Sequence, residues 1–258
     1  MATYESWATS GGLIESWVNT PSDSTSGFYI PPDGAKFLIV CAQGSGGGGG
    51  GGDYESSSYN AGGGGGGGGG YMRDFLIPCA DLASIAYTMG AGGAGGAQND
   101  WGVTGGDASM GTFFSCLGGV RGDHGRSTSS SDTAGFYGSG SGTIFGETTT
   151  PGLVPTLFGV IAGSRGGTGG ADSTNTFPID GLANTTHAAG VAVGTAEDDG
   201  GGGGASANGA GGSGSARATL PTTPTGFGGG GGGGNGLIGY PYDGAAGADG
   251  FLWVRAYG

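Results

Sequence analysis

Basic side chains are scarce in this sequence. Its 258 residues include 20 acidic residues against 7 basic ones, for a formal net charge of −13, and Lys36 is the only lysine. A nucleic-acid-binding surface needs clustered basic groups to neutralise phosphates, and an anionic membrane surface attracts proteins through the same groups. The composition therefore excludes nucleic acid as a partner and disfavours membrane surfaces. We interpret the acidity as a contribution to solubility.

Long apolar runs and cysteine pairs are also missing. No stretch approaches the ~20 apolar residues that span a membrane, so no membrane insertion is expected, and residues 1–5 do not resemble a signal peptide. Cys41, Cys79 and Cys116 are odd in number and widely spaced. We expect buried free thiols in a protein made in a reducing cytoplasm. A Cys41–Cys79 disulfide is the alternative.

Catalytic and metal-binding motifs are absent as well. His124 and His187 lie far apart, outside any metal-ligand spacing. The chain has no Cys-x-x-Cys, no phosphate-binding loop ending in lysine, and no Gly-x-Ser-x-Gly nucleophile elbow. Acidic residues 197–199 are more typical of a solvated turn than of a cation site. The sequence therefore predicts neither an enzyme nor a cofactor or metal site.

Glycine is what the chain has in excess, with 72 residues against an average usage near 7%. Even so, 35% of the residues are hydrophobic, and they form short clusters between the glycine runs, unlike the composition of disordered chains. We find no convincing amphipathic helix and expect an all-β fold. The clusters rich in aromatic and β-branched residues predict strands at 35–42, 71–77, 85–89, 111–117, 153–162 and 251–257. Both faces of 251–257 are mostly apolar, which predicts a central strand.

Residues 1–27 differ from the rest and suggest a separate N-terminal segment before a glycine-rich domain at 28–258. Two similar phrases, Glu-Ser-Trp-Ala-Thr at 5–9 and Glu-Ser-Trp-Val-Asn at 15–19, contain Trp7 and Trp17. One interpretation is a strand pair or arm that covers part of the core. The other is an attachment segment whose two tryptophans dock on a partner protein.

The glycine runs at 46–52, 62–70, 200–204 and 228–234 predict packed rods. Ordering a glycine costs more backbone entropy than ordering any other residue, so such a run stays disordered unless specific contacts offset that cost. The extended threefold helix of polyproline II type has no internal hydrogen bonds. Its N–H and C=O groups point outward, and glycine lets neighbouring helices approach closely. Flexible linkers between strands are the alternative; collagen is excluded because no strict Gly-X-Y repeat occurs.

The order of these features carries a family resemblance. Strand-like 30–40 leads into glycine run 46–52, and run 62–70 leads into 71–75. Segments 89–96, 105–113 and 247–254 continue the series. The succession resembles the glycine-rich, polyglycine II domain of tailed-phage tail fibres and fibre-tip adhesins, over about residues 28–258. The resemblance implies a jelly-roll or tumour-necrosis-factor-like β-sandwich joined to a bundle of polyglycine II helices, with no substantial α-helix.

The same resemblance implies a function. We expect a virion structural protein of the tail fibre or tail tip, made in the host cytoplasm, that binds a host surface glycan or outer-membrane protein through loop tips. The N-terminal segment would attach to other virion proteins, and the chain would form a homo-oligomer, a trimer by analogy. Aromatic rings suit such contacts because they combine a flat apolar face with a polar edge. The candidate receptor-binding residues are Tyr54, Tyr59, Asn60, Trp101, His124, Tyr137, Tyr240 and Tyr242; the candidate attachment residues are Trp7 and Trp17.

Two other functions remain open at this point. One is a head-decorating fibre or minor virion protein that binds no specific receptor. The other is a polyglycine II ice-binding protein, which should present a flat face of regularly spaced small residues.

Overall fold

The chain forms strands and extended segments. The computed structural model describes residues 12–22, 25–56, 59–80, 82–128, 131–140, 142–145, 159–171, 178–183, 187–192, 198–216, 219–237 and 242–258. These residues contain strands and no helix, which confirms the all-β prediction. The strands are β1 (Leu13–Asn19), β2 (Ser26–Tyr29), β3 (Phe37–Gln43), β4 (Asp53–Ser56), β5 (Tyr59–Ala61), β6 (Tyr71–Pro78), β7 (Ile85–Met89), β8 (Ala108–Met110), β9 (Phe114–Cys116), β10 (Arg126–Thr128), β11 (Ser131–Thr133), β12 (Thr143–Phe145), β13 (Gly159–Ile161), β14 (Asn208–Ala210), β15 (Thr225–Phe227) and β16 (Phe251–Tyr257).

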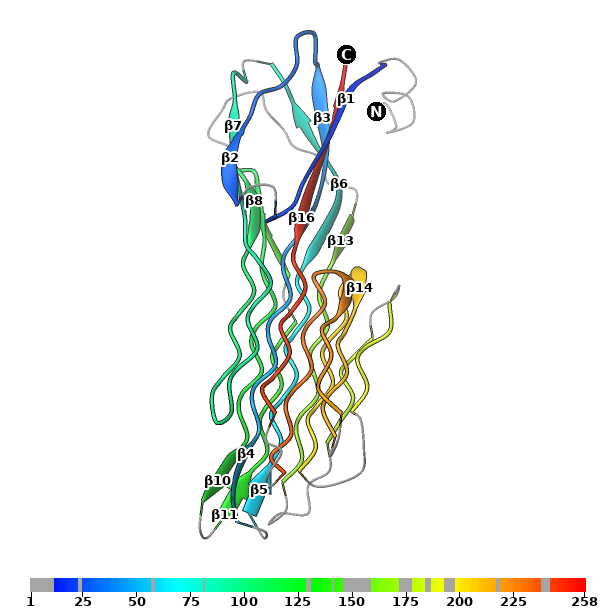
Figure 1. The fold of residues 1–258 in the computed structure, drawn as a ribbon. Coiled ribbons are helices and arrows are strands. Elements are labelled where there is room, and N and C mark those ends of the chain that lie inside the picture. The colour runs from blue at the N-terminus through cyan, green and yellow to red at the C-terminus, as the bar shows by residue number, and fades with distance from the viewer. Residues whose placement is uncertain are drawn as a thin grey trace.

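Two five-stranded antiparallel sheets form a sandwich at one end of the molecule (Figure 1). The first has the order β1-β16-β3-β6-β13 and the second β12-β9-β8-β7-β2. β16 lies between β1 and β3, which confirms its predicted central place. β1 forms an edge of the first sheet through its pairing with β16. The boundary expected at residue 27 falls inside β2.

The core lies between the two sheets, where Leu38, Val40 and Leu252 pack against Phe114 and Met110. β3 is buried along its whole length. Its other face adds a smaller cluster, in which Phe37 stacks on Tyr257 with ring centroids 5.2 Å apart. An uninterrupted apolar strand is what burial on both faces requires.

The strand expected at 111–117 is interrupted. A turn at 111–113 separates β8 from β9, and these two short strands pair with each other. Gly111 has φ +53°, in the left-handed region, which glycine enters without the strain that a Cβ would cause. The aromatic pair Phe113-Phe114 suggested one continuous strand and concealed this reversal. Of the strand expected at 153–162, residues 159–161 form β13, and residues 153–158 lie outside the described residues.

The glycine runs are rods with a repeat of three residues, and their hydrogen bonds reveal that repeat. In rod 44–52 the backbone partner changes with every residue and returns to the same neighbouring rod every third residue. The N–H groups of this rod donate in turn to three antiparallel rods. Gly46 donates to Ala248 and Gly49 to Ala245; Gly47 donates to Gly67 and Gly50 to Gly64; Gly48 donates to Val103 and Gly51 to Asp100. A threefold extended helix without internal hydrogen bonds produces this pattern.

Four rods lie inside the bundle, 44–52, 62–70, 199–205 and 228–235, and they contain the four unbroken glycine runs. Each is hydrogen-bonded to rods on all sides; rod 44–52, for example, is bonded to 62–70, 90–97, 101–107, 117–125, 228–235 and 242–250. A Cβ added at Gly66 would lie 2.1 Å from the carbonyl oxygen of Gly47. Along most of their packed length, interior rods therefore leave no room for a side chain.

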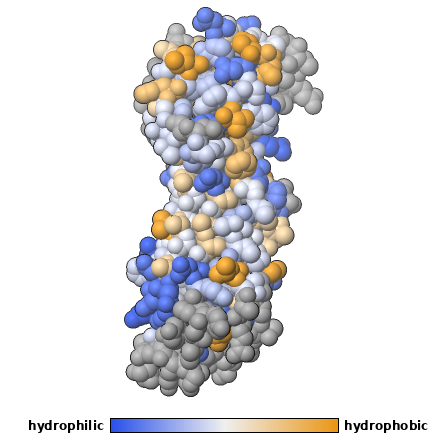
Figure 2. All heavy atoms as spheres, viewed as in Figure 1, coloured by the Kyte–Doolittle hydropathy of each residue, from blue (hydrophilic) through white to orange (hydrophobic). Residues whose placement is uncertain are grey.

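Outer rods have packed and open sides. In rod 90–97 the alanines at 91, 94 and 97 are exposed, whereas Gly93 and Gly96 are buried. In this rod, alanine thus occupies the exposed positions and glycine the packed ones. The visible face of the bundle is accordingly pale in Figure 2, with isolated apolar residues and one hydrophilic patch on the left-hand rods above β10.

Gln43 joins the sandwich to the rods. Its side chain is fully buried, and Nε2 donates hydrogen bonds to the carbonyl oxygens of Gly44, Gly69 and Gly70 at 2.9–3.1 Å. Its Oε1 accepts a bond of 3.0 Å from Nδ2 of Asn208. One amide therefore links β3, the end of rod 62–70 and β14 at the level where strands become rods.

The molecule is elongated, with the sandwich at one end and the hairpins β4–β5 and β10–β11 at the other (Figure 1). β1, the first described strand, and β16, which ends at Tyr257, both lie in the sandwich. The rods carry the chain away from the sandwich and back, so the hairpin end is far from the described ends of the chain.

Candidate functional site

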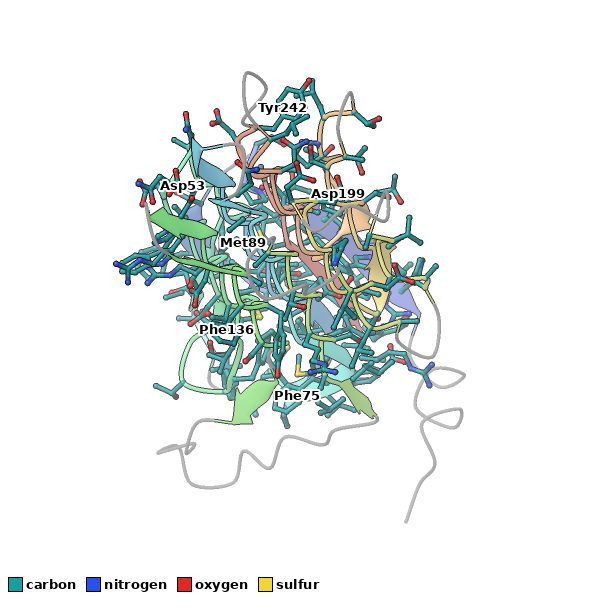
Figure 3. The ribbon with its side chains drawn as sticks, turned by 90° about the horizontal axis from the view of Figure 1, so that it is seen from below. Asp53, Phe75, Met89, Phe136, Asp199 and Tyr242 are labelled. Carbon is teal, nitrogen blue, oxygen red and sulfur yellow. The ribbon has the colours of Figure 1, made fainter. Side chains whose placement is uncertain are left out.

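Several residues that the sequence nominated belong to the far end of the rods, which Figure 3 shows from below with Tyr242 labelled. Tyr54 and Tyr59 belong to the hairpin β4–β5, in which Tyr54 pairs with Asn60; their side chains lie outside the described residues. Asp53 ties this hairpin to β10, because its Oδ2 accepts the N–H of Ser127 at 3.0 Å. Tyr242 is half-buried, and its backbone carbonyl accepts the N–H of Gly52. Asn60 is 4% exposed, so its side chain is not available to a receptor in this conformation.

A second group lies on the side of the bundle. Trp101 is 47% exposed, and the guanidinium carbon of Arg121 lies 4.4 Å from the centroid of its ring. The ring of His124 lies 5.6 Å from the ring of Trp101, and its Nδ1 is 2.7 Å from the carbonyl oxygen of Gly125. In rod 117–125, residues 121 and 124 are one threefold repeat apart. Their side chains therefore both lean toward the rod that begins with Trp101.

A similar pair lies two rods away. Arg165 stacks on Tyr137, with its guanidinium carbon 4.5 Å from the ring centroid. Tyr137 is 37% exposed, and its neighbour Phe136 is 61% exposed. Both aromatic residues stand between Gly135 and Gly138, whose buried positions face rod 117–125: an added Cβ there would meet the carbonyl oxygens of Asp123 and Val120. The buried glycines thus turn the two rings toward the surface.

Backbone hydrogen bonds set both pairs at one height along the bundle. The N–H of Gly102 donates to Gly122, that of Asp123 to Phe136, and that of Gly166 to Gly138, at 2.8–3.1 Å. Rods 101–107, 117–125, 134–140 and 162–170 are therefore neighbours in this order. We call the row of Trp101, Arg121, Phe136, Tyr137 and Arg165 the aromatic–arginine belt.

The belt unites only some of the nominated residues. Trp101 and Tyr137 belong to it and His124 lies beside Trp101, whereas Tyr54, Tyr59 and Tyr242 belong to the hairpin end. Tyr240 and Trp7 lie outside the described residues. Trp17 is half-buried, with its ring 5.4 Å from Tyr29 and 5.1 Å from Tyr87. Trp17 therefore packs on the core, in keeping with the interpretation of this segment as a covering strand.

Three belt residues were not nominated from the sequence: Arg121, Phe136 and Arg165. Each is one or two residues from glycines spaced three apart, at 119, 122 and 125, at 135 and 138, or at 163, 166 and 169. In an outer rod that spacing marks the side that faces the bundle. The residues between such glycines are the ones displayed, and this signal could have identified all three.

The titratable groups of the sandwich do not form a nucleophilic site. Burial raises the pKa of the Cys41 thiol, and the nearby carboxylate of Asp74 adds to this rise. Oδ1 of that carboxylate accepts a hydrogen bond from the Cys41 thiol at 3.6 Å and also pairs with Arg255, 2.6 Å from Nη2. All three cysteines are buried and none forms a disulfide, so the Cys41–Cys79 alternative does not hold. Among the residues that the structure describes, no group of three or more His, Cys, Asp or Glu side chains could hold a metal ion.

The comparison with known families agrees with this architecture. A model described as a glycine-rich domain matches residues 21–257, which is most of the chain. The chain belongs to this glycine-rich domain family. No curated protein matches it. Within the described part of this glycine-rich domain, no helix is long and apolar enough to cross a membrane.

Proposed function

We propose that this glycine-rich domain protein is a virion structural protein of a phage tail fibre or tail tip, and that it binds the host cell surface. The display of Trp101, Phe136 and Tyr137 on fixed rods is the observation that carries the proposal. Large aromatic side chains contribute much of the binding energy at interfaces. Rods held by backbone bonds on several sides keep the rings ordered before binding, which reduces the entropy lost on association.

The arrangement of the two ends of the molecule supports the same function. The sandwich contains the described ends of the chain, and the hairpin end projects away from it (Figure 1). An attachment at the sandwich end, through the N-terminal segment, would leave the rods and the hairpins accessible to a cell. Tyr54, Tyr59 and Tyr242 would then contribute to the contact at the tip.

Exposed apolar residues on the sandwich support oligomerisation as part of the proposal. Phe28 and Ile30, on and just after edge strand β2, are 73% and 68% exposed, and Leu13 and Val18 on edge strand β1 are also exposed. Edge strands with apolar side chains favour association. Burial of these side chains between sandwiches would yield the homo-oligomer, a trimer by analogy with related sandwiches.

Immunogold electron microscopy of the parent virus, with antibodies against this chain, tests the proposal. We expect gold at the tail tip or at the fibre ends, and we expect the purified protein to compete with virions for adsorption to host cells. Gold on the head, with no competition, would favour the head-decorating alternative. Absence from particles would overturn the virion assignment.

One observation favours the ice-binding alternative enough to test it. The exposed alanines at 91, 94 and 97 form a row with a three-residue repeat. The neighbouring rod 242–250 interrupts this face with the exposed residues Asp243 and Asp249, which a flat small-residue surface would not tolerate. We expect a thermal-hysteresis assay to find no activity; measurable hysteresis would support the alternative.

A further inference from the structure

We propose that the aromatic–arginine belt binds an acidic oligosaccharide, a chain of sugars that carry carboxylate groups. The inference rests on the host-binding function proposed above and names the class of receptor. It assigns the contact to the side of the rods, in addition to the loop tips that the sequence analysis favoured.

The two stacked arginines supply the charge. Arg121 and Arg165 lie over aromatic rings at 4.4 and 4.5 Å. The ion pairs of the described residues join Arg73 and Arg255 to Asp74 and involve neither belt arginine. A guanidinium that is stacked but not paired keeps its N–H groups available, and its planar fork matches a carboxylate.

Phe136 supplies an apolar face between the two charges. It is 61% exposed, and folding therefore gains little from its ring. A sugar ring has a face of C–H groups that stacks on such a ring, while its carboxylate and hydroxyl groups reach the flanking guanidinium groups. A row of guanidinium, aromatic ring and guanidinium suits a polymer of repeating units better than it suits a small molecule that binds in a pocket.

Backbone N–H groups hold two of the carboxylates near the belt, which keep their negative charge. Asp107 Oδ1 accepts the N–H of Gly118 at 2.8 Å, and Asp100 Oδ1 accepts that of Trp101 at 2.7 Å. Asp123, on the same rod as Arg121, is the carboxylate that opposes an anionic ligand most directly. The chain has only 7 basic arginine and lysine residues, and two of them, Arg121 and Arg165, belong to the belt.

Titration calorimetry with oligogalacturonate, and with polysialic acid as a second carboxylated chain, tests the inference. A neutral maltooligosaccharide of similar length is the control ligand. We expect the wild-type protein to bind at least one acidic chain and the neutral chain at least about tenfold more weakly. Added salt should weaken the acidic interaction.

Variants locate the site. Arg121→Gln with Arg165→Gln should weaken binding by at least about tenfold, and Trp101→Ala should weaken it too. Asp123→Asn should strengthen it. Lys36→Gln, which removes one exposed positive charge from the sandwich, is the matched control and should leave the affinity unchanged. Circular dichroism and melting temperature identify any variant whose fold has changed; the charge variants, being at the surface, should match the wild type.

The outcomes separate this inference from the proposed function. Gold at the tail with no binding to either acidic chain, or equal binding of the neutral chain, overturns the acidic-glycan assignment and leaves the virion role standing. A receptor contact made with an outer-membrane protein alone would give the same pattern. If the protein binds an acidic chain through the belt but is absent from virions, the acidic-glycan assignment holds and the virion role is overturned.

Discussion

Interior rods require glycine because the neighbouring rods are too close for a side chain, not because the backbone turns there. At Gly49, Gly65 and Gly230 an added Cβ would lie 2.1 Å from a backbone carbonyl oxygen of the adjacent rod. A backbone atom cannot move aside as the tip of a side chain can, so the whole rod would have to shift. The absence of a side chain at these positions is thus a packing requirement of the same kind as complementary shape in an apolar core.

We therefore expect Gly66→Val to destabilise the protein by more than about 3 kcal/mol, at or beyond the upper end of overpacking effects. Its Cβ would lie 2.1 Å from the carbonyl oxygen of Gly47 and force rods 44–52 and 62–70 apart. Denaturant unfolding or soluble yield measures the effect. Gly142→Ala, whose added Cβ meets nothing within 4 Å, is the control. A soluble, equally stable Gly66→Val protein would refute the lattice.

Buried acids of the sandwich predict a loss of stability in alkali. Burial raises the pKa of Cys79 from 9.0 to about 11. Burial, with the nearby charge of Glu15, raises that of Tyr29 to about 12. Because the folded state favours the protonated thiol, the stabilisation from Cys79 is complete below pH 9.0 and is lost as the pH rises toward about 11.

We expect the free energy of unfolding to fall between neutral pH and about pH 10.5, and to fall less in Cys79→Ala. Tyr29 remains in both proteins, so only the difference between their slopes reports on the thiol. Denaturant titrations at several pH values measure it. Equal slopes in the two proteins would show that the thiol ionises as readily in the folded state as in the unfolded chain.

At the scale of the element, the outer rods differ from the interior rods in their hydrogen bonding, because they have neighbouring rods on only some of their sides. Some of their N–H groups point where no further rod follows, and aspartates on adjacent rods accept several of them. Asp249 Oδ1 accepts the N–H of Gly92 at 2.8 Å, and Asp243 Oδ1 that of Gln98 at 2.9 Å. Asp180 does the same for Ala192. Part of the acidity that we ascribed to solubility thus completes the hydrogen bonding of the lattice edge.

The double variant Asp243→Ala with Asp249→Ala should lose about 1 kcal/mol for each bond, with faster hydrogen exchange at the Gly92 and Gln98 amides. The matched variant with asparagine at both positions keeps an acceptor oxygen and should stay close to the wild type. If the alanine variant exchanged at the wild-type rate, the aspartates would be solvated charges without a structural role.

At the scale of the whole molecule, strands and rods are continuous. β3 runs into rod 44–52, rod 62–70 into β6, and rod 242–250 into β16, while Gln43 bonds to both parts. No rod is stable alone, because a threefold extended helix has no internal hydrogen bonds. The sandwich fixes the register at which three of them start.

We therefore expect one cooperative unfolding transition. Calorimetry should give a single peak, and its midpoint should match that of near-ultraviolet circular dichroism, which follows the aromatic residues of the sandwich. Coincident transitions by different probes are the usual test of two-state behaviour. Two separated transitions would show that the lattice and the sandwich fold as independent units.

Much of this fold could be predicted from the sequence, because two local signals are strong. An unbroken glycine run is compatible only with a rod lattice or with disorder. An apolar run such as 37–42 is compatible only with a buried strand. The interruption at Gly111 could not be predicted in this way, since a glycine inside an aromatic cluster does not reveal its own φ. The candidate residues were harder to place: Trp101, His124 and Tyr137 share one face, but Asn60 is buried.

The sequence by itself determined the kinds of part: apolar runs such as 37–42 and 251–257 that become buried strands, unbroken glycine runs that become rods, and an excess of acidic over basic groups. Only the tertiary structure decided which rods are neighbours and at what height, because each backbone bond joins residues far apart in the chain. Arg121 meets Trp101, and Arg165 meets Tyr137, through that register. A polyglycine rod has no side chains with which to encode its partners, so the belt exists only once the whole lattice has packed.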